Sequence, residues 1–161
     1  MTLADRTPDL ITNACSPSLL TSNMVIADTG FRLALANPRD AYHQAASDWL
    51  ARSDEGLATT WPVVTETCHL LSVRIGAQAQ QSFVRSRCQG AAEMAPPNAD
   101  DLPRIEALMA KYADLPMDLA DASLMILAER LGHGRILSTD ERDFRTDRWK
   151  RHAPFEHLLA I

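Results

Sequence analysis

The chain has few of the residues that build disulfide frameworks, zinc sites or histidine-based metal sites. Its three cysteines are odd in number and far apart, and none belongs to a Cys-x-x-Cys pair, which argues against both a zinc site and a disulfide framework. Its five histidines include no His-x-x-x-His pair, which argues against a metalloprotease-like site. A chain of this kind is suited to a reducing compartment, so we expect a cytoplasmic protein.

Long apolar runs are also missing. No stretch approaches the length needed to span a membrane. Residues 1–23 are rich in Thr, Ser, Asn, Asp and Pro and lack the basic start and apolar run of a signal peptide. We expect this segment to be a mobile tail and residues 24–161 to form one domain. Translation that starts at Met24 would explain the tail, and the intact mass of the natively expressed protein tests this hypothesis.

An excess of positive charge is absent as well. The formal net charge is -5 at pH 7, which is not typical of a nucleic-acid-binding protein, although a local basic patch matters more than the total. The residues are 46% hydrophobic and 23% charged, which is ordinary for a globular domain.

What the sequence does contain is an alternation of short apolar runs and helical patterns. Val25–Ala27 is a nearly continuous apolar run, as expected for a strand buried on both faces. Further strands are predicted at 56–60, 91–95, 135–139 and 155–161, and helices at 31–36, 41–52, 62–75, 77–88, 100–112 and 118–131. Residues 142–152 are predicted to be a basic loop. This alternation predicts an α/β domain with a mainly parallel central sheet.

The stretch from Met117 to Phe144 is the most informative. A helix that is apolar on most faces follows Asp118 and ends at Gly132, and the next short strand ends at Asp140. Asp118 and Asp121 are three residues apart and therefore share one helix face. Ionised carboxylates at the ends of buried elements repel one another, which is costly unless a cation neutralises them.

Four acids from separate segments are expected to meet at one edge of the sheet. Asp28 and Asp140 follow the carboxyl ends of predicted strands, where ligands bind in open α/β sheets. Glu66 and Asp121 lie near the starts of helices that follow connections on the same side. Each acid alone has a local explanation, such as a helix cap, a turn or the helix dipole. Their joint occurrence at one edge favours a functional site.

Several motifs in this order resemble the PIN domains, and among them the toxins of the VapBC type. The motifs are Val25-Ile26-Ala27-Asp28-Thr29-Gly30, Thr65-Glu66, Asp118-Leu119-Ala120-Asp121-Ala122-Ser123 with Leu127-Ala128-Glu129-Arg130, and Thr139-Asp140-Glu141-Arg142-Asp143-Phe144. The resemblance covers the chain from Val25 onward. It implies a three-layer α/β/α fold, Mg2+- or Mn2+-dependent ribonuclease activity, a small antitoxin partner and a homodimer.

By matching position, the resemblance implies a four-acid catalytic and metal-binding set of Asp28, Glu66, Asp121 and Asp140, with Asp118 and Asp143 as accessory acids. The oxygen-only donor set independently suits Mg2+ or Mn2+. Since no serine or cysteine nucleophile with a nearby base is evident, water activated by metal is the expected nucleophile. Asp28 and Asp121 are expected to hold the principal ion, and Glu66 and Asp140 to hold a second ion or orient water.

Hydroxyl and basic side chains are expected to assist these acids. Three hydroxyl side chains, Thr29, Ser123 and Thr139, are candidates for a hydrogen bond to an acid or a phosphate, and local capping is the alternative for each. Five basic residues follow Asp140 and are candidate contacts to an RNA backbone, with a solvated loop as the alternative. These five residues are Arg142, Arg145, Arg148, Lys150 and Arg151. Single-stranded or looped RNA is the expected substrate, since its bases are accessible.

Three other functions are compatible with an α/β fold of this size. A nuclease of the same fold could act in RNA maturation or on DNA without being a toxin, and growth arrest relieved by a co-encoded partner separates these functions. A non-catalytic nucleic-acid-binding module is the second alternative, and the presence of all four acids argues against it. A phosphorylated receiver domain is the third. It requires an acidic pair at the first strand and a lysine near the last, and neither Asp28-Thr29 nor the Ser138-Thr139-Asp140 end supplies that arrangement.

Overall fold

The computed structural model describes residues 23–112, 117–140, 148–150 and 153–159. Five strands form one parallel sheet in the order β3-β2-β1-β4-β7. The strands are β1 (Met24–Ala27), β2 (Gly56–Thr59), β3 (Glu93–Met94), β4 (Arg135–Leu137) and β7 (Glu156–His157). A separate antiparallel pair joins β5 (Arg148–Lys150) to β6 (Ala153–Pro154). The predicted α/β class with a mainly parallel sheet is confirmed.

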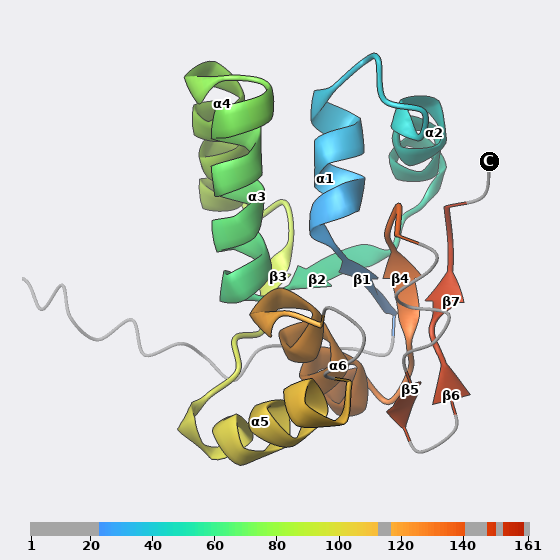
Figure 1. The fold of residues 1–161 in the computed structure, drawn as a ribbon. Coiled ribbons are helices and arrows are strands. Elements are labelled where there is room, and N and C mark those ends of the chain that lie inside the picture. The colour runs from blue at the N-terminus through green and yellow to red at the C-terminus, as the bar shows by residue number, and fades with distance from the viewer. Residues whose placement is uncertain (1–22, 113–116, 141–147, 151–152, 160–161) are drawn as a thin grey trace, which may run out of the picture.

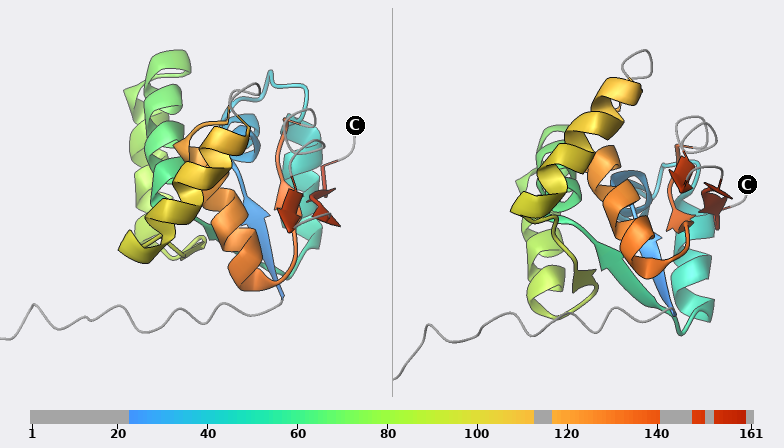
Figure 2. Two further views of the ribbon diagram at one scale, coloured as in Figure 1. Left: turned by 60° about the horizontal axis from the view of Figure 1, so that its bottom comes forward. Right: turned by 90° about the horizontal axis from the view of Figure 1, so that it is seen from below.

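Helices cover both faces of the sheet, which gives three α/β/α layers (Figure 1, Figure 2). The helices are α1 (Thr29–Ala36), α2 (His43–Arg52), α3 (Trp61–Arg74), α4 (Ala77–Cys88), α5 (Leu102–Lys111) and α6 (Leu119–Leu131), with a 3-10 turn at Ala99–Asp101. Helices α1 to α4 lie on one side of the sheet in Figure 1, and α5 and α6 lie on the other. Within the described ranges, no helix is both long and apolar enough to cross a membrane.

Strand β1 shows why the sheet lies at the centre of the molecule. Successive side chains of a strand point to opposite faces. Val25 and Ala27 accordingly belong to the core shared with α1 and α2, whereas Ile26 belongs to the core shared with α5 and α6. All three side chains are fully buried. The continuous apolar run therefore reflects burial on two faces, as the sequence predicts.

Helix α6 is the buried helix that its composition predicts. Ala120 and every residue from 122 to 128 are buried. The helix begins at a capping box made by Asp118 and Asp121, and it ends at Gly132, whose φ of 78° is in the left-handed region that favours glycine. The apolar body fixes α6 against the sheet, and the capping box holds both acids at its exposed end.

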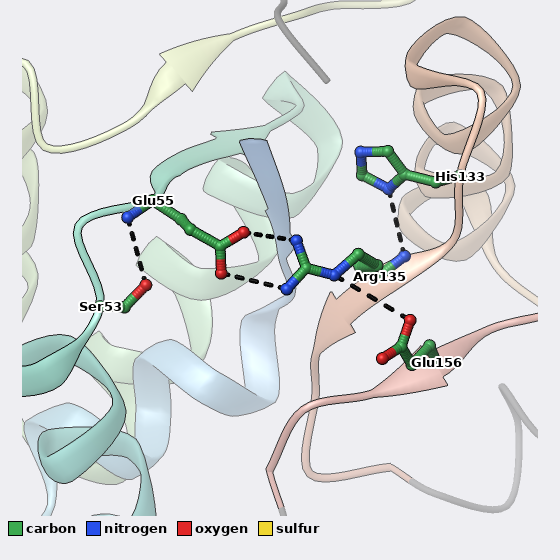
Figure 3. A network of polar contacts seen from close by, with 5 residues as sticks. All are labelled: Ser53, Glu55, His133, Arg135 and Glu156. Atoms are coloured by element: carbon green, nitrogen blue, oxygen red, sulfur yellow. Dashed lines mark hydrogen bonds and ion pairs between the residues drawn. The ribbon is translucent and has the colours of Figure 1, made fainter. Parts of the chain in front are cut away.

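The edge of the sheet at which β4 starts carries a compensated charge network (Figure 3). The guanidinium of Arg135 makes two hydrogen bonds to the carboxylate of Glu55, one of them 3.1 Å long, and its Nε lies 4.0 Å from Glu156. The hydrogen bond to Arg135 lowers the pKa of Glu55, and the same bond raises the pKa of Arg135. This network joins the residue before β2 to β4 and β7. Its charged groups lie at the edge of the sheet opposite the one at which the strands end.

Several boundaries differ from those predicted. Helix α1 begins at Thr29, two residues earlier than the apolar pattern indicates, because Asp28 caps it. The predicted basic loop at 142–152 contains strand β5, and the predicted strand at 155–161 is shortened to the two residues of β7. Strand β5 pairs with β6 and β7 pairs with β4, and local composition does not encode such short pairings. The predicted tail lies outside the described residues except for Asn23.

Candidate functional site

A cavity of about 280 Å3 lies where the first and fourth strands end. Its lining is Asp28, Thr29, Gly30, Leu33, Glu66, Leu70, Arg74, Asp118, Asp121, Thr139 and Asp140. The four acids that the sequence places in the catalytic set are therefore brought together around one cavity, along with two of the three accessory residues, Asp118 and Thr139. The remaining accessory acid, Asp143, lies outside the described residues.

Asp28 connects strand β1 to helix α1 and is almost fully buried, with 7% of its surface exposed. Its carboxylate accepts hydrogen bonds from the backbone N–H of Thr29 at 2.6 Å and from the hydroxyl of Ser138 at 2.7 Å. Burial raises the pKa of Asp28 to about 6; these hydrogen bonds oppose the rise, and the negative charge of Glu66 adds to it. The side chain is thus fixed in place and carries a charge that the protein only partly compensates.

Glu66 reaches the same cavity from helix α3. Its carboxylate accepts a hydrogen bond of 2.6 Å from the hydroxyl of Thr29, which is itself buried. Thr29 therefore donates to two acids, through its backbone N–H to Asp28 and through its hydroxyl to Glu66. The sequence names Thr29 as a candidate for a hydrogen bond to an acid, and this double role depends on the packing of α1 against α3.

The capping box of α6 supplies Asp121, the third acid of the set, and the accessory acid Asp118. Asp118 accepts a hydrogen bond from the N–H of Asp121 at 3.0 Å, and Asp121 accepts one from the N–H of Asp118 at 3.3 Å. Asp118 is exposed, whereas Asp121 is half-buried. Burial raises the pKa of Asp121 to about 8, and the negative charges of Asp118, Asp28 and Glu66 add to the rise. The same two residues therefore cap the helix and belong to the acidic cluster. Their role as helix caps does not exclude a role in a functional site.

Thr139 and Asp140 complete the cavity from the end of β4. The backbone N–H of Asp140 donates to the Ser138 hydroxyl at 3.0 Å, and that hydroxyl donates to Asp28. A Cβ atom placed on Gly30 would lie 2.2 Å from Oγ1 of Thr139 and 3.2 Å from its backbone nitrogen. Glycine at position 30 is therefore needed for the start of α1 to approach the end of β4.

One basic residue of the cavity was not among those predicted from the sequence. Arg74 is the basic side chain among the lining residues of the cavity. It lies on α3 four residues after Leu70 and eight after Glu66, about one and two helical turns respectively, so its spacing from Glu66 was the available signal. The predicted contacts Arg142, Arg145 and Arg151 lie outside the described residues. Arg148 and Lys150 belong to β5, whose side chains are not described.

The donors suit a hard divalent cation in kind. Carboxylate and hydroxyl oxygens line the cavity without histidine or cysteine. Burial raises the pKa of Asp28 and of Asp121, so their ionised forms are costly and a bound cation would stabilise them. Within the described part of the chain, however, no three acidic, histidine or cysteine side chains are grouped closely enough to hold one ion as they stand. The local hydrogen bonds of Asp121 and Glu66 must loosen, or water must bridge, for these oxygens to share an ion.

The class of protein is defined by the parallel sheet, its two helical layers and the acidic cavity where the strands end. The family model of the PIN domain matches residues 25–148, so the chain belongs to the PIN-domain family. It is similar to Ribonuclease VapC26 of Mycobacterium tuberculosis (strain ATCC 25618 / H37Rv), with 31% identity over 120 residues that cover 74% of this chain and 89% of that protein.

The fold is shared with a solved structure. The crystal structure of Mycobacterium tuberculosis VapC20, described as a toxin that cleaves the sarcin-ricin loop, superposes with a TM-score of 0.68. It is 22% identical, and the match covers 73% of this chain and 91% of that one. The resemblance drawn from the motifs, and the three-layer fold that it implies, are thereby confirmed.

Proposed function

We propose that this protein is a Mg2+- or Mn2+-dependent endoribonuclease and the toxin of a type II toxin-antitoxin pair. The observation that carries this proposal is the meeting of four acids from four separate segments in one cavity. These acids are Asp28, Glu66, Asp121 and Asp140. Membership of the PIN-domain family and the similarity to a protein named as a ribonuclease support RNA as the substrate.

Two of the four acids are assigned to the principal ion. Asp28 and Asp121 have the raised pKa values, so they gain most from a cation and are assigned to the principal ion. Glu66 and Asp140 are assigned to a second ion or to the orientation of water. A divalent cation bound there supplies activation of water and stabilisation of the leaving oxygen. Ser138 holds Asp28 and Thr29 holds Glu66, so both hydroxyls position the carboxylates.

RNA binding requires positive charge beside an acidic cavity. Arg74 is placed at the cavity wall and is exposed, which suits a contact with a phosphate of a bound strand. Thr139 lines the cavity from the end of β4, where its hydroxyl suits a hydrogen bond to a phosphate. The basic residues after Asp140 extend this surface in the proposal. A single-stranded or looped substrate remains the expected one.

The toxin role implies a small antitoxin protein, and we propose that it docks on the layer of α1 and α2. Phe31 is fully buried there in edge-to-face contact with Trp49, while Leu35 and Trp49 are only partly buried. A basic side chain of the partner that enters the acidic cavity would compete with metal. We also propose a homodimer, and sedimentation as a monomer at micromolar protein would contradict that assembly.

The direct test is cleavage of single-stranded RNA by the purified protein with Mg2+, with Mn2+ and with a chelator. We expect metal-dependent cleavage that is lost in Asp121→Asn and in Asp28→Asn. Glu55→Gln is the matched control, because it removes a carboxylate from the opposite edge of the sheet and should retain cleavage. Full metal-dependent cleavage by Asp121→Asn would overturn the site assignment.

The toxin role has a separate test in growing cells. Expression of the wild-type chain should arrest growth, and co-expression of a small protein encoded beside it should relieve the arrest. Asp121→Asn should not arrest growth. Cleavage of RNA in vitro without any growth arrest would favour a nuclease of RNA maturation instead.

A further inference from the structure

A second cavity, of about 490 Å3, lies in the helical layer that contains α1 and α4. Its lining is Phe31, Arg32, Leu35, Ala36, Leu50, Leu57, Leu71, Ala79, Ser82, Phe83, Ser86, Arg87 and Ala91. It shares no lining residue with the acidic cavity. The walls come from four helices and strand β2, most of them are apolar, and none of the lining residues is acidic. The volume falls within the range of roughly 300–1,000 Å3 that is typical of small-molecule sites.

Two arginines line this apolar cavity from different helices. Arg32 of α1 is buried, with 6% of its surface exposed, and Arg87 of α4 is half-buried. The guanidinium carbon of each lies 5.5 Å from the centre of the Phe83 ring. The two cations are therefore gathered around one aromatic side chain, although like charges repel.

The guanidinium groups are under-satisfied. Among the residues that the structure describes, Nε and Nη2 of Arg32 and Nε and Nη1 of Arg87 are buried without a hydrogen-bond partner. Burial and, second, the charge of Arg87 lower the pKa of Arg32 to about 9, and the carboxylate of Asp28 opposes this only in part. A buried charge is costly without a paired acceptor, and contact with an aromatic ring offsets only part of that cost.

We propose that Arg32 and Arg87 form an anion-binding site, which takes a carboxylate carried on an apolar body. The two guanidiniums present unpaired N–H donors around Phe83, and a carboxylate accepts such donors in a planar fork. The apolar walls accept the aliphatic part of the ligand. A phosphate suits these walls less well, because it has no apolar part to place against them.

The carboxylate has two candidate sources with the same chemistry. One is a free small molecule with a short aliphatic chain. The other is an aspartate or glutamate in an apolar segment of a protein, which would extend the surface that we propose for the antitoxin. The anion site itself does not depend on RNA cleavage, so its test uses binding and leaves the nuclease assignment untouched.

The experiment measures binding to the purified full chain by calorimetry, in a buffer free of carboxylate and phosphate. The probes are octanoate, octanol, inorganic phosphate, and the blocked peptides Leu-Glu-Leu and Leu-Gln-Leu. The variants are Arg32→Met, Arg87→Met and Arg87→Lys. Arg85→Met is the control, because Arg85 is an exposed arginine of the same helix that does not line the cavity. Circular dichroism shows whether each variant is folded, and Arg87→Lys keeps the charge at the half-buried position if Arg32→Met disturbs the core.

We expect saturable binding of octanoate or of the Glu peptide to the wild type and to Arg85→Met, and binding weaker by at least about tenfold in each of the other variants. Octanol, phosphate and the Gln peptide should bind the wild type more weakly than octanoate or the Glu peptide does, by a similar factor. Tighter binding of octanoate assigns a free carboxylate, and tighter binding of the Glu peptide assigns a protein carboxylate. The proposal would be overturned if neither octanoate nor the Glu peptide binds the wild type, or if the Arg32 and Arg87 variants bind them as tightly as the wild type does.

Discussion

The hydroxyl of Thr29 donates a 2.6 Å hydrogen bond to the carboxylate of Glu66, and the two residues come from helices α1 and α3. Because the backbone N–H of Thr29 also donates to Asp28, one residue sets the distance between two acids of the proposed site. The hydroxyl of Thr67 lies 3.3 Å from that of Thr29 and donates a shorter bond of 2.7 Å to the backbone carbonyl of Val63. Both acids are thus positioned by hydrogen bonds from one buried residue, Thr29.

The first prediction concerns that hydroxyl. Thr29→Val keeps the branched shape but releases Glu66, so we expect RNA cleavage and metal affinity to fall roughly tenfold, as for other residues that orient ligands. Thr29→Ser should retain nearly full cleavage. Thr65→Val is the control, because the exposed Thr65 donates only to Trp61 within its own helix. Cleavage rates across a metal titration test this prediction, and an unchanged rate in Thr29→Val would show that Glu66 needs no positioning.

The second prediction follows from the raised pKa values of Asp28 and Asp121. A carboxyl with a raised pKa in the folded state binds more protons there than in the unfolded state, so stability falls as the pH rises. The fall should extend from about pH 4, near the ordinary pKa, to about pH 8, near that of folded Asp121. We expect the melting temperature of the metal-free wild type to drop across this window.

A comparison with Asp121→Asn isolates the cause. This variant should lose less stability than the wild type as the pH rises through that window and should be the more stable protein at its upper end, because the neutral amide removes a repelled charge. At the same upper end, Mn2+ should raise the melting temperature of the wild type, and should do so much less in the variant. Parallel pH profiles of the two metal-free proteins would contradict the assignment.

The third prediction concerns the close approach of Gly30 to Thr139. Gly30→Ala places a methyl group 2.2 Å from Oγ1 of Thr139, and overpacking of this kind typically costs about 1–3 kcal/mol. We expect lower stability and weaker cleavage, since the start of α1 and the end of β4 must separate. Adding Thr139→Ala should restore only part of the stability, since the backbone contact at 3.2 Å remains. Gly56→Ala is the control, because its nearest contacts are an ordinary 3.5 Å from Met24.

Much of this fold and site is present in local sequence patterns. The run Val25–Ala27 before Asp28 predicts a buried strand with a carboxylate at its end, and the apolar helix after Asp118 predicts α6. These predictions succeed because strand burial and helix capping depend on neighbouring residues. The boundary of α1 was predicted wrongly because the cap at Asp28 starts the helix earlier than the apolar pattern indicates. Strand β5 was missed because its short pairing with β6 is not encoded in local propensity.

The specific contacts between elements could not be predicted from the sequence. The hydrogen bond from Thr29 to Glu66 and the approach of Gly30 to Thr139 require the packing of α1 between α3 and β4. Arg74 and Arg87 are ordinary helical arginines in the sequence, and only the fold places one beside the acids and the other in an apolar cavity. Tertiary packing decides these roles, and no periodicity encodes it.

The fourth prediction tests Arg74 as a phosphate contact. Arg74→Met should weaken RNA binding and lower the slope of log affinity against log salt by about one, as expected for the loss of one phosphate contact. Metal affinity should stay close to that of the wild type. Arg85→Met should change neither quantity, since Arg85 does not line the acidic cavity. Binding to uncleavable RNA at several salt concentrations measures the slope, and an unchanged slope would remove Arg74 from the substrate surface.

The fifth prediction ranks the two acids of the α6 capping box. Both aspartates cap the helix through backbone N–H groups, and asparagine caps nearly as well as aspartate. Substitution of either by asparagine therefore changes charge with little effect on capping. Asp118 is exposed, whereas Asp121 is half-buried and has a pKa raised to about 8.

The cation should therefore gain more from Asp121 than from Asp118. We expect Asp118→Asn to weaken cleavage and metal affinity only a few-fold, and Asp121→Asn to abolish cleavage at any metal concentration. Cleavage rates titrated with Mg2+ and Mn2+ separate the two effects, because higher metal should rescue Asp118→Asn alone. Complete loss in both variants would make Asp118 a direct ligand. It would also show that exposure at the helix end does not distinguish the capping acid from the metal-binding one.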